Sequence, residues 1–68
     1  MYAIFKFKRD TTYAGVEDGV PEVHFGRQGH VTRGKIVDEQ YAEWAALILI
    51  KNSRGVFSLP AKDVEQVK

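Results

Sequence analysis

The segment WAALILIKNSRGVFSLP, residues 44–60, places two apolar runs on either side of a short turn sequence. Leucine and isoleucine fill residues 47–50, and such a short apolar run beside turn residues favours a β-strand. Residues 52–55 (NSRG) are a turn signal, and residues 56–59 (VFSL) are largely apolar again. Two apolar runs around a short glycine-containing turn predict a β-hairpin.

A helix is the alternative interpretation of the first half of this region. Asp38 is a suitable helix cap, and residues 38–54 contain several good helix formers. The turn signal at residues 52–55 leads directly into a second apolar run, and this order favours strand–turn–strand over helix.

The predicted strand after Trp44 is apolar on both faces, because successive side chains of a strand point to opposite sides. Trp44, Ala46, Ile48 and Ile50 share one face, and Ala45, Leu47 and Leu49 share the other. Either the strand is covered on both sides, or Ile48 and Ile50 form an exposed apolar stripe. Such a stripe marks an interface, including one between two copies joined through residues 44–50.

Short strands are also predicted on both sides of this hairpin. The candidates are residues 2–8, 22–25 and 30–37, the last with a bulge at Gly34. Residues 9–21 are rich in Thr, Gly, Asp and Pro and indicate a long loop or an irregular hairpin. Residues 60–67 predict a short helical turn and a last strand. Several short strands separated by turns are typical of a small all-β barrel or sandwich.

The composition is that of one small globular domain spanning residues 1–68, with 44% apolar and 28% charged residues. There is no cysteine, which excludes disulfides and thiolate zinc sites and agrees with a cytoplasmic location. The longest apolar run, residues 44–50, is too short to cross a bilayer. Lysines interrupt the apolar N-terminal residues, unlike a signal peptide, so we expect neither a targeting segment nor membrane binding.

Four segments, in chain order, resemble the Src-homology-3 (SH3) family. The matching segments are AIFKF (residues 3–7), EVHFGRQGHV (residues 22–31), EWAA (residues 43–46) and PAKDV (residues 60–64). The last is similar to the family's Pro-Ser-Asn-Tyr-Val, and Trp44 lies where the family has its Trp-Trp pair. The resemblance implies a small five-stranded SH3-like barrel with a short helical turn before the last strand.

The resemblance also implies a groove that binds proline-rich peptides on aromatic rings. Trp44 and Pro60 match groove positions, whereas Phe5 and Phe7 stand where the family has tyrosines and lack their hydroxyls. Asp63 stands where the last groove tyrosine is expected, and an aspartate does not stack on a proline ring. The sequence therefore supports the fold more strongly than the family's usual ligand.

The leading functional prediction is a non-enzymatic module that docks onto a protein partner as an adaptor, complex subunit or inhibitor, of the bacterial or phage accessory type. Aromatic and apolar side chains, Trp44 among them, would contact the partner, and carboxylates would steer a basic segment of that partner. The predicted partner-binding residues are Phe5, Phe7, Glu17, Asp18, Trp44, Ile48, Ile50, Pro60 and Asp63.

The alternative prediction is a nucleic-acid-associated barrel of the translation or transcription type. Arg27, Arg33 and Lys35 would contact phosphates, although a net charge of +1 argues against indiscriminate polyanion binding. No catalytic residue, metal or cofactor is predicted. His24 and His30 lack the spacing of a metal site, and 68 residues leave little room for the concave site that most enzymes need.

Overall fold

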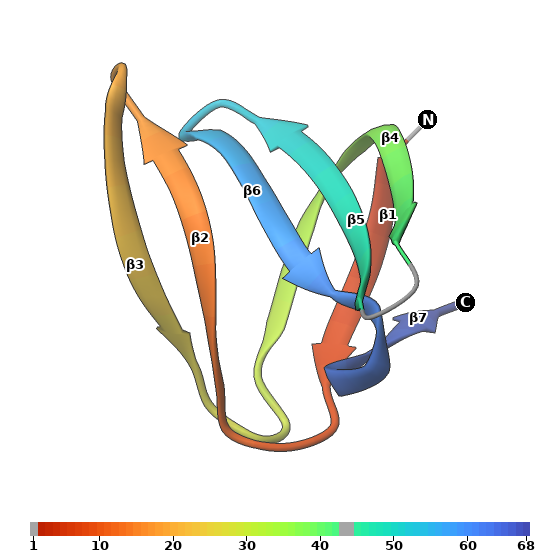
Figure 1. Cartoon of the computed structure of the whole chain (residues 1–68). Helices are drawn as coiled ribbons and strands as arrows, with labels where there is room; N and C mark the ends of the chain where they lie inside the picture. Colours follow the sequence, from red (N-terminus) through yellow and green to blue (C-terminus); the bar gives the residue numbers. More distant parts are fainter. Residues whose placement is uncertain (1, 43–44) are drawn as a thin grey trace.

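The computed structural model describes residues 2–42 and 45–68, with side chains described for residues 2–37 and 46–68. Seven β-strands and one short 3-10 helix make up this part of the chain (Figure 1). The strands are β1 (Tyr2–Phe7), β2 (Thr11–Glu17), β3 (Val20–Gly26), β4 (Val31–Ala42), β5 (Ala45–Asn52), β6 (Gly55–Pro60) and β7 (Val64–Val67), and the helix is η1 (Ala61–Asp63).

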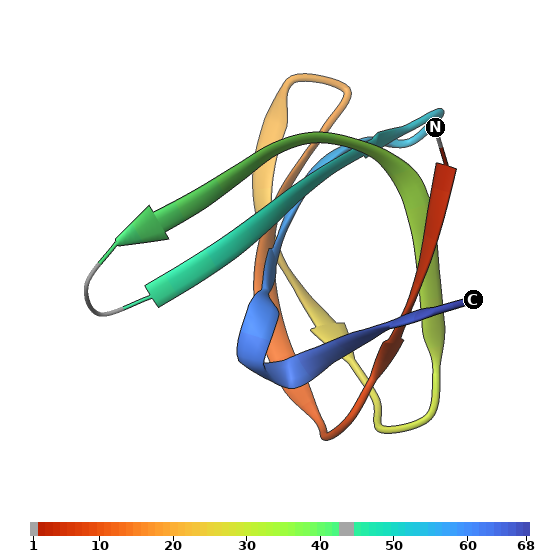
Figure 2. The same ribbon diagram turned by 90° about the vertical axis from the view of Figure 1, so that its right-hand side faces the viewer.

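All seven strands belong to one open antiparallel sheet with the order β3-β2-β6-β5-β4-β1-β7. The sheet is strongly curled, and the far ends of β4 and β5 project beyond the other strands (Figure 2). Two edges remain, at β3 and at β7, because each of these strands has one neighbour among the described residues. The structure therefore has a concave inner side, a convex outer side and two free edges.

The all-β class agrees with the sequence prediction, but the predicted five-stranded barrel is wrong. The difference lies mainly at residues 9–21, which form all of β2 and the start of β3, a regular hairpin where a long loop or an irregular hairpin is predicted. Asp18 and Gly19 join the two strands with φ of 50° and 76°, the left-handed values of a tight two-residue hairpin turn. The extra hairpin adds strands to the sheet, which stays open.

The hairpin predicted from residues 44–60 is present as β5 and β6, so the alternative helix over residues 38–54 is wrong. The predicted helical turn and last strand are also present, as η1 and β7. The bulge predicted at Gly34 is displaced along β4, since the register with β5 shifts between Ile36 and Asp38.

The core lies on the concave side and takes alternate residues from several strands. In β1 the side chains of Ala3, Phe5 and Phe7 are buried, and those between them are exposed. The other buried apolar residues are Ile50, Phe57, Leu59 and Val64. Burial of these side chains is the main favourable contribution to folding of so small a domain.

An aromatic cluster of Phe7, Tyr13, His24 and Phe57 extends this core toward β2 and β3. The rings of Phe7 and Tyr13 are stacked with centroids 5.5 Å apart, and the rings of His24 and Phe57 meet edge to face at 5.2 Å. Gly15 leaves room for the rings, because a Cβ there would lie 2.5 Å from the Phe57 ring. The strand therefore contains glycine where neighbouring rings occupy the side-chain space.

Candidate binding surfaces

Most of the aromatic and apolar residues predicted to bind a partner are inside the protein. Phe5 is 2% exposed, Phe7 is 3% exposed and Ile50 is fully buried. Ile48 is partly buried and packs against the core. The predicted exposed stripe of Ile48 and Ile50 is therefore wrong, because this face of β5 points to the concave side.

Asp63 is also buried and acts as a local link rather than as a steering charge. Its carboxylate accepts a hydrogen bond from Thr11 Oγ1 at 3.0 Å and lies 3.4 Å from Arg9 Nε. The backbone N–H of Lys8 donates to the Asp63 carbonyl at 2.8 Å. These contacts attach η1 to the connection between β1 and β2, which explains why an acid occupies this position.

The remaining predicted partner-binding residues that the structure describes lie at two separate places, the β2–β3 hairpin and the end of β6. Glu17 forms an ion pair with Arg54 at 3.0 Å, and Asp18 is exposed at the tip of the β2–β3 hairpin. Pro60 is half-buried at the end of β6, opposite Leu47. Trp44 lies outside the described residues. The described members of this group therefore form no joint site.

The three basic residues of the nucleic-acid prediction divide into two places. Arg27 lies in the β3–β4 turn with its guanidinium 5.8 Å from the centre of the Phe25 ring. Arg33 and Lys35 are exposed two residues apart on β4, opposite Ile4 and Tyr2 of β1. Of these three basic residues, only Arg33 and Lys35 share a surface.

An outward-facing apolar surface covers the opposite half of the sheet, across β3, β2, β6 and β5. One row of paired residues runs Val23, Ala14, Ser58 and Leu49, and the next runs Pro21, Val16, Val56 and Lys51. We call the apolar members of these rows, Ala14, Val16, Pro21, Val23, Leu49 and Val56, the apolar face. They line an open hollow of about 550 Å³ together with Gly15, Glu22 and Ser58.

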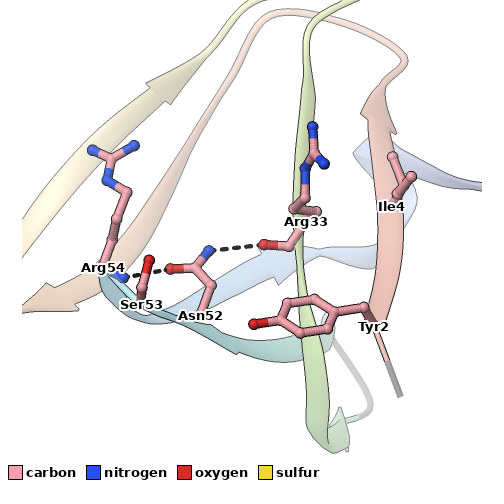
Figure 3. A pocket seen from close by; sticks show the side chains of 6 residues that line it. All are labelled: Tyr2, Ile4, Arg33, Asn52, Ser53 and Arg54. Atoms are coloured by element: carbon pink, nitrogen blue, oxygen red, sulfur yellow. Dashed lines mark hydrogen bonds between the residues drawn. The ribbon is translucent and has the colours of Figure 1, made fainter.

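A second outward-facing surface lies over β1, β4 and the β5–β6 turn (Figure 3). We call its exposed aromatic, apolar and basic residues, Tyr2, Ile4, Arg33, Lys35, Lys51 and Arg54, the cationic face. Tyr2, Ile4, Arg33 and Arg54 line a hollow of about 560 Å³ with Asn52 and Ser53. Lys35 and Lys51 line an adjacent hollow of about 400 Å³, again with Tyr2.

The aromatic cluster contains two titratable groups, the Tyr13 hydroxyl and the His24 ring. Burial raises the pKa of the Tyr13 hydroxyl above its usual value, while Arg54 lowers it and Glu17 raises it. Nε2 of His24 is buried without a hydrogen-bond partner in the described structure.

No group of three or more His, Cys, Asp or Glu side chains suited to a metal ion occurs among the described residues. The described residues also contain no helix long and apolar enough to cross a membrane.

Sequence reasoning missed the apolar face and selected only Arg33 and Lys35 from the cationic face, although β1 left a readable signal for more of it. Residues 2–8 alternate, and the same alternation that buries Phe5 turns Tyr2 and Ile4 outward beside Lys6. The apolar face had no such signal, because its members come from four strands, and the sequence of one of them, β2, predicts a long loop or an irregular hairpin.

Comparisons with protein-family models, with curated proteins and with solved structures find no match to this chain. The resemblance to the SH3 family is therefore neither supported nor opposed and stays a prediction. Functional proposals for this chain depend on the geometry of its two outer surfaces.

Proposed function

We propose that the protein is a small non-enzymatic module that docks onto a protein partner through the apolar face. The observation that carries this proposal is the continuous apolar surface over four adjacent strands, with Val23 78% exposed and Val16 42% exposed. A sheet normally covers its apolar faces with another layer, and nothing in the described chain covers this one. Exposed apolar patches of this kind mark interaction sites.

The charges beside the apolar face indicate the chemistry of the partner. Asp18 is exposed at the tip of the hairpin that carries Val16 and Val23, whereas Glu22 borders the hollow but points its side chain to the other side of the sheet. Glu17 is less available, since it already binds Arg54. A segment with apolar side chains and a basic residue at one end complements this arrangement, and the carboxylates would raise its association rate. We thus keep the sequence-based prediction of a basic partner, but we assign the apolar contacts with that partner to the apolar face.

Photo-crosslinking in extracts of the native host tests this proposal. A benzoylphenylalanine at Val23 is expected to crosslink a distinct protein, and the same group at Val31 is not. Val31 is a suitable control because it is 52% exposed on β4, outside the apolar face. Val23→Asp is expected to weaken binding of the crosslinked partner at least tenfold, whereas Val31→Asp leaves it unchanged.

Two outcomes would contradict the proposal. Equal crosslinking from both positions would show that the apolar face has no specific partner. A product of twice the chain mass, and no other, would show that a second copy covers the face instead. Both variants change exposed side chains, so we expect their free energies of unfolding to stay within about 0.5 kcal/mol of the unmodified protein.

A further inference from the structure

Tyr2 stands between two hollows on the cationic face. Its side chain is 67% exposed on β1 and lines both hollows, one with Arg33 and Arg54 and the other with Lys35 and Lys51. In Figure 3 the Tyr2 ring and the Arg33 side chain project from neighbouring strands, with the Asn52 amide between Arg33 and the β5–β6 turn. An aromatic ring is thus accessible with cations on two sides.

The pairing of the strands concentrates positive charge around this ring. Lys35 lies directly opposite Lys51 in β5 and directly opposite Tyr2 in β1. Like charges at directly opposed positions destabilise a sheet, so this arrangement opposes folding unless an anion binds between them. No described acid lines either hollow, and Glu17, which contacts Arg54 from β2, is already paired with it at 3.0 Å.

The β5–β6 turn is held in place beside the first hollow. Asn52 Nδ2 donates to the Arg33 carbonyl at 2.8 Å, and the Arg54 backbone N–H donates to Asn52 Oδ1 at 2.9 Å. One amide side chain therefore ties the turn to β4 and fixes the position of Arg54 relative to Arg33. A site that is formed before the ligand arrives loses less entropy on binding.

We infer that the cationic face binds single-stranded nucleic acid, with an unpaired base stacked on Tyr2 and phosphates beside Arg33, Lys35 and Lys51. Cations that follow a backbone, together with an aromatic ring that accepts any base, are the elements of sequence-tolerant single-strand binding. A duplex keeps its bases stacked on each other and leaves none for Tyr2. An acidic polypeptide would bind the basic side chains of the cationic face but would have no base to stack on the Tyr2 ring. This inference is independent of the proposed docking function, which uses the apolar face.

Fluorescence anisotropy with labelled dT12 and rU12 tests the inference, starting at 20 mM salt. Neutralising about three phosphates gives a slope of roughly −2 for the logarithm of the binding constant against that of salt. Arg33→Gln combined with Lys35→Gln is expected to make this slope shallower by about 1.4. Tyr2→Ala is expected to weaken binding roughly tenfold, whereas Tyr2→Phe keeps the ring and stays within about twofold.

The matched control removes two cations elsewhere. Arg27→Gln with Lys62→Gln lowers the net charge by the same amount, at the β3–β4 turn and at η1, and is expected to leave affinity and slope nearly unchanged. Equal losses in both double variants would show diffuse charge attraction and overturn the inference. Equal affinity for a 12-base-pair duplex or for polyglutamate, no effect of Tyr2→Ala, or no binding at 20 mM salt would also overturn it.

Discussion

The β5–β6 hairpin and the β2–β3 hairpin both have two-residue turns but opposite surroundings. β5 and β6 lie in the middle of the sheet, and their inward side chains Ile50, Phe57 and Leu59 are buried. β3 lies at an edge, where Val20, Val23 and Phe25 are all more than half exposed. The same residue types therefore stabilise the fold in one hairpin and remain available for contacts in the other.

Replacing one apolar residue in each hairpin gives the largest expected difference. Leu59→Ala empties a fully buried site in β6 and is expected to lower the free energy of unfolding by about 2–5 kcal/mol. Val23→Ala in β3 is expected to change it by no more than about 0.5 kcal/mol. Urea denaturation followed by far-ultraviolet circular dichroism measures both, and similar losses would refute the division between the hairpins.

The substitution Gly15→Ala tests the packing between β2 and β6, the strands at which the two hairpins meet. The added Cβ would lie 2.5 Å from the Phe57 ring and 2.9 Å from the His24 ring, so these rings must move. We expect a loss of about 1–3 kcal/mol, as for other overpacked cores. Thr12→Val, on the outward side of the same strand, is the control and should stay within about 0.5 kcal/mol. A fully stable Gly15→Ala protein would mean that the β2–β3 hairpin shifts freely on β6.

The smallest expected effect concerns alkaline pH. Because burial raises the pKa of Tyr13 in the folded protein, the unfolded chain loses this proton first as pH rises above about 10. The folded state then binds more protons than the unfolded state, so this contribution to stability is complete below pH 10 and falls as pH increases. Tyr13→Phe is expected to make the alkaline loss of stability less steep, measured by urea denaturation from pH 7 to 11. Tyr2→Phe controls for loss of a hydroxyl, and equal slopes for wild type and Tyr13→Phe would contradict this role.

The sequence predicted the central hairpin better than the edge hairpin for a physical reason. Residues 47–59 combine continuous apolar runs with a clear turn, as strands with neighbours on both sides usually do. Residues 9–21 contain Gly15 and Pro21, which usually indicate loops. In the structure Gly15 gives space to two rings, and Pro21 is tolerated because β3 is an edge strand. Both reasons depend on residues distant in sequence.

The sequence also did not show which face of β5 points toward the core. Alternation separates Ile48 and Ile50 from Leu47 and Leu49, but when both sets are apolar, it does not say which one faces the core. The structure buries Ile50 and leaves Leu49 on the apolar face. The predicted contact residues Ile48 and Ile50 therefore pack in the core, and the apolar face consists of positions that the sequence analysis had not selected.

Pro21 has one further consequence, for how copies of this protein behave when crowded. An edge strand offers its free backbone groups to any other chain, and apolar edge strands are common starting points for fibres. Proline has no N–H, so a foreign strand laid along β3 would lack a bond at that position. Pro21 thus makes β3 a poorer template for a foreign strand than the same edge without proline would be.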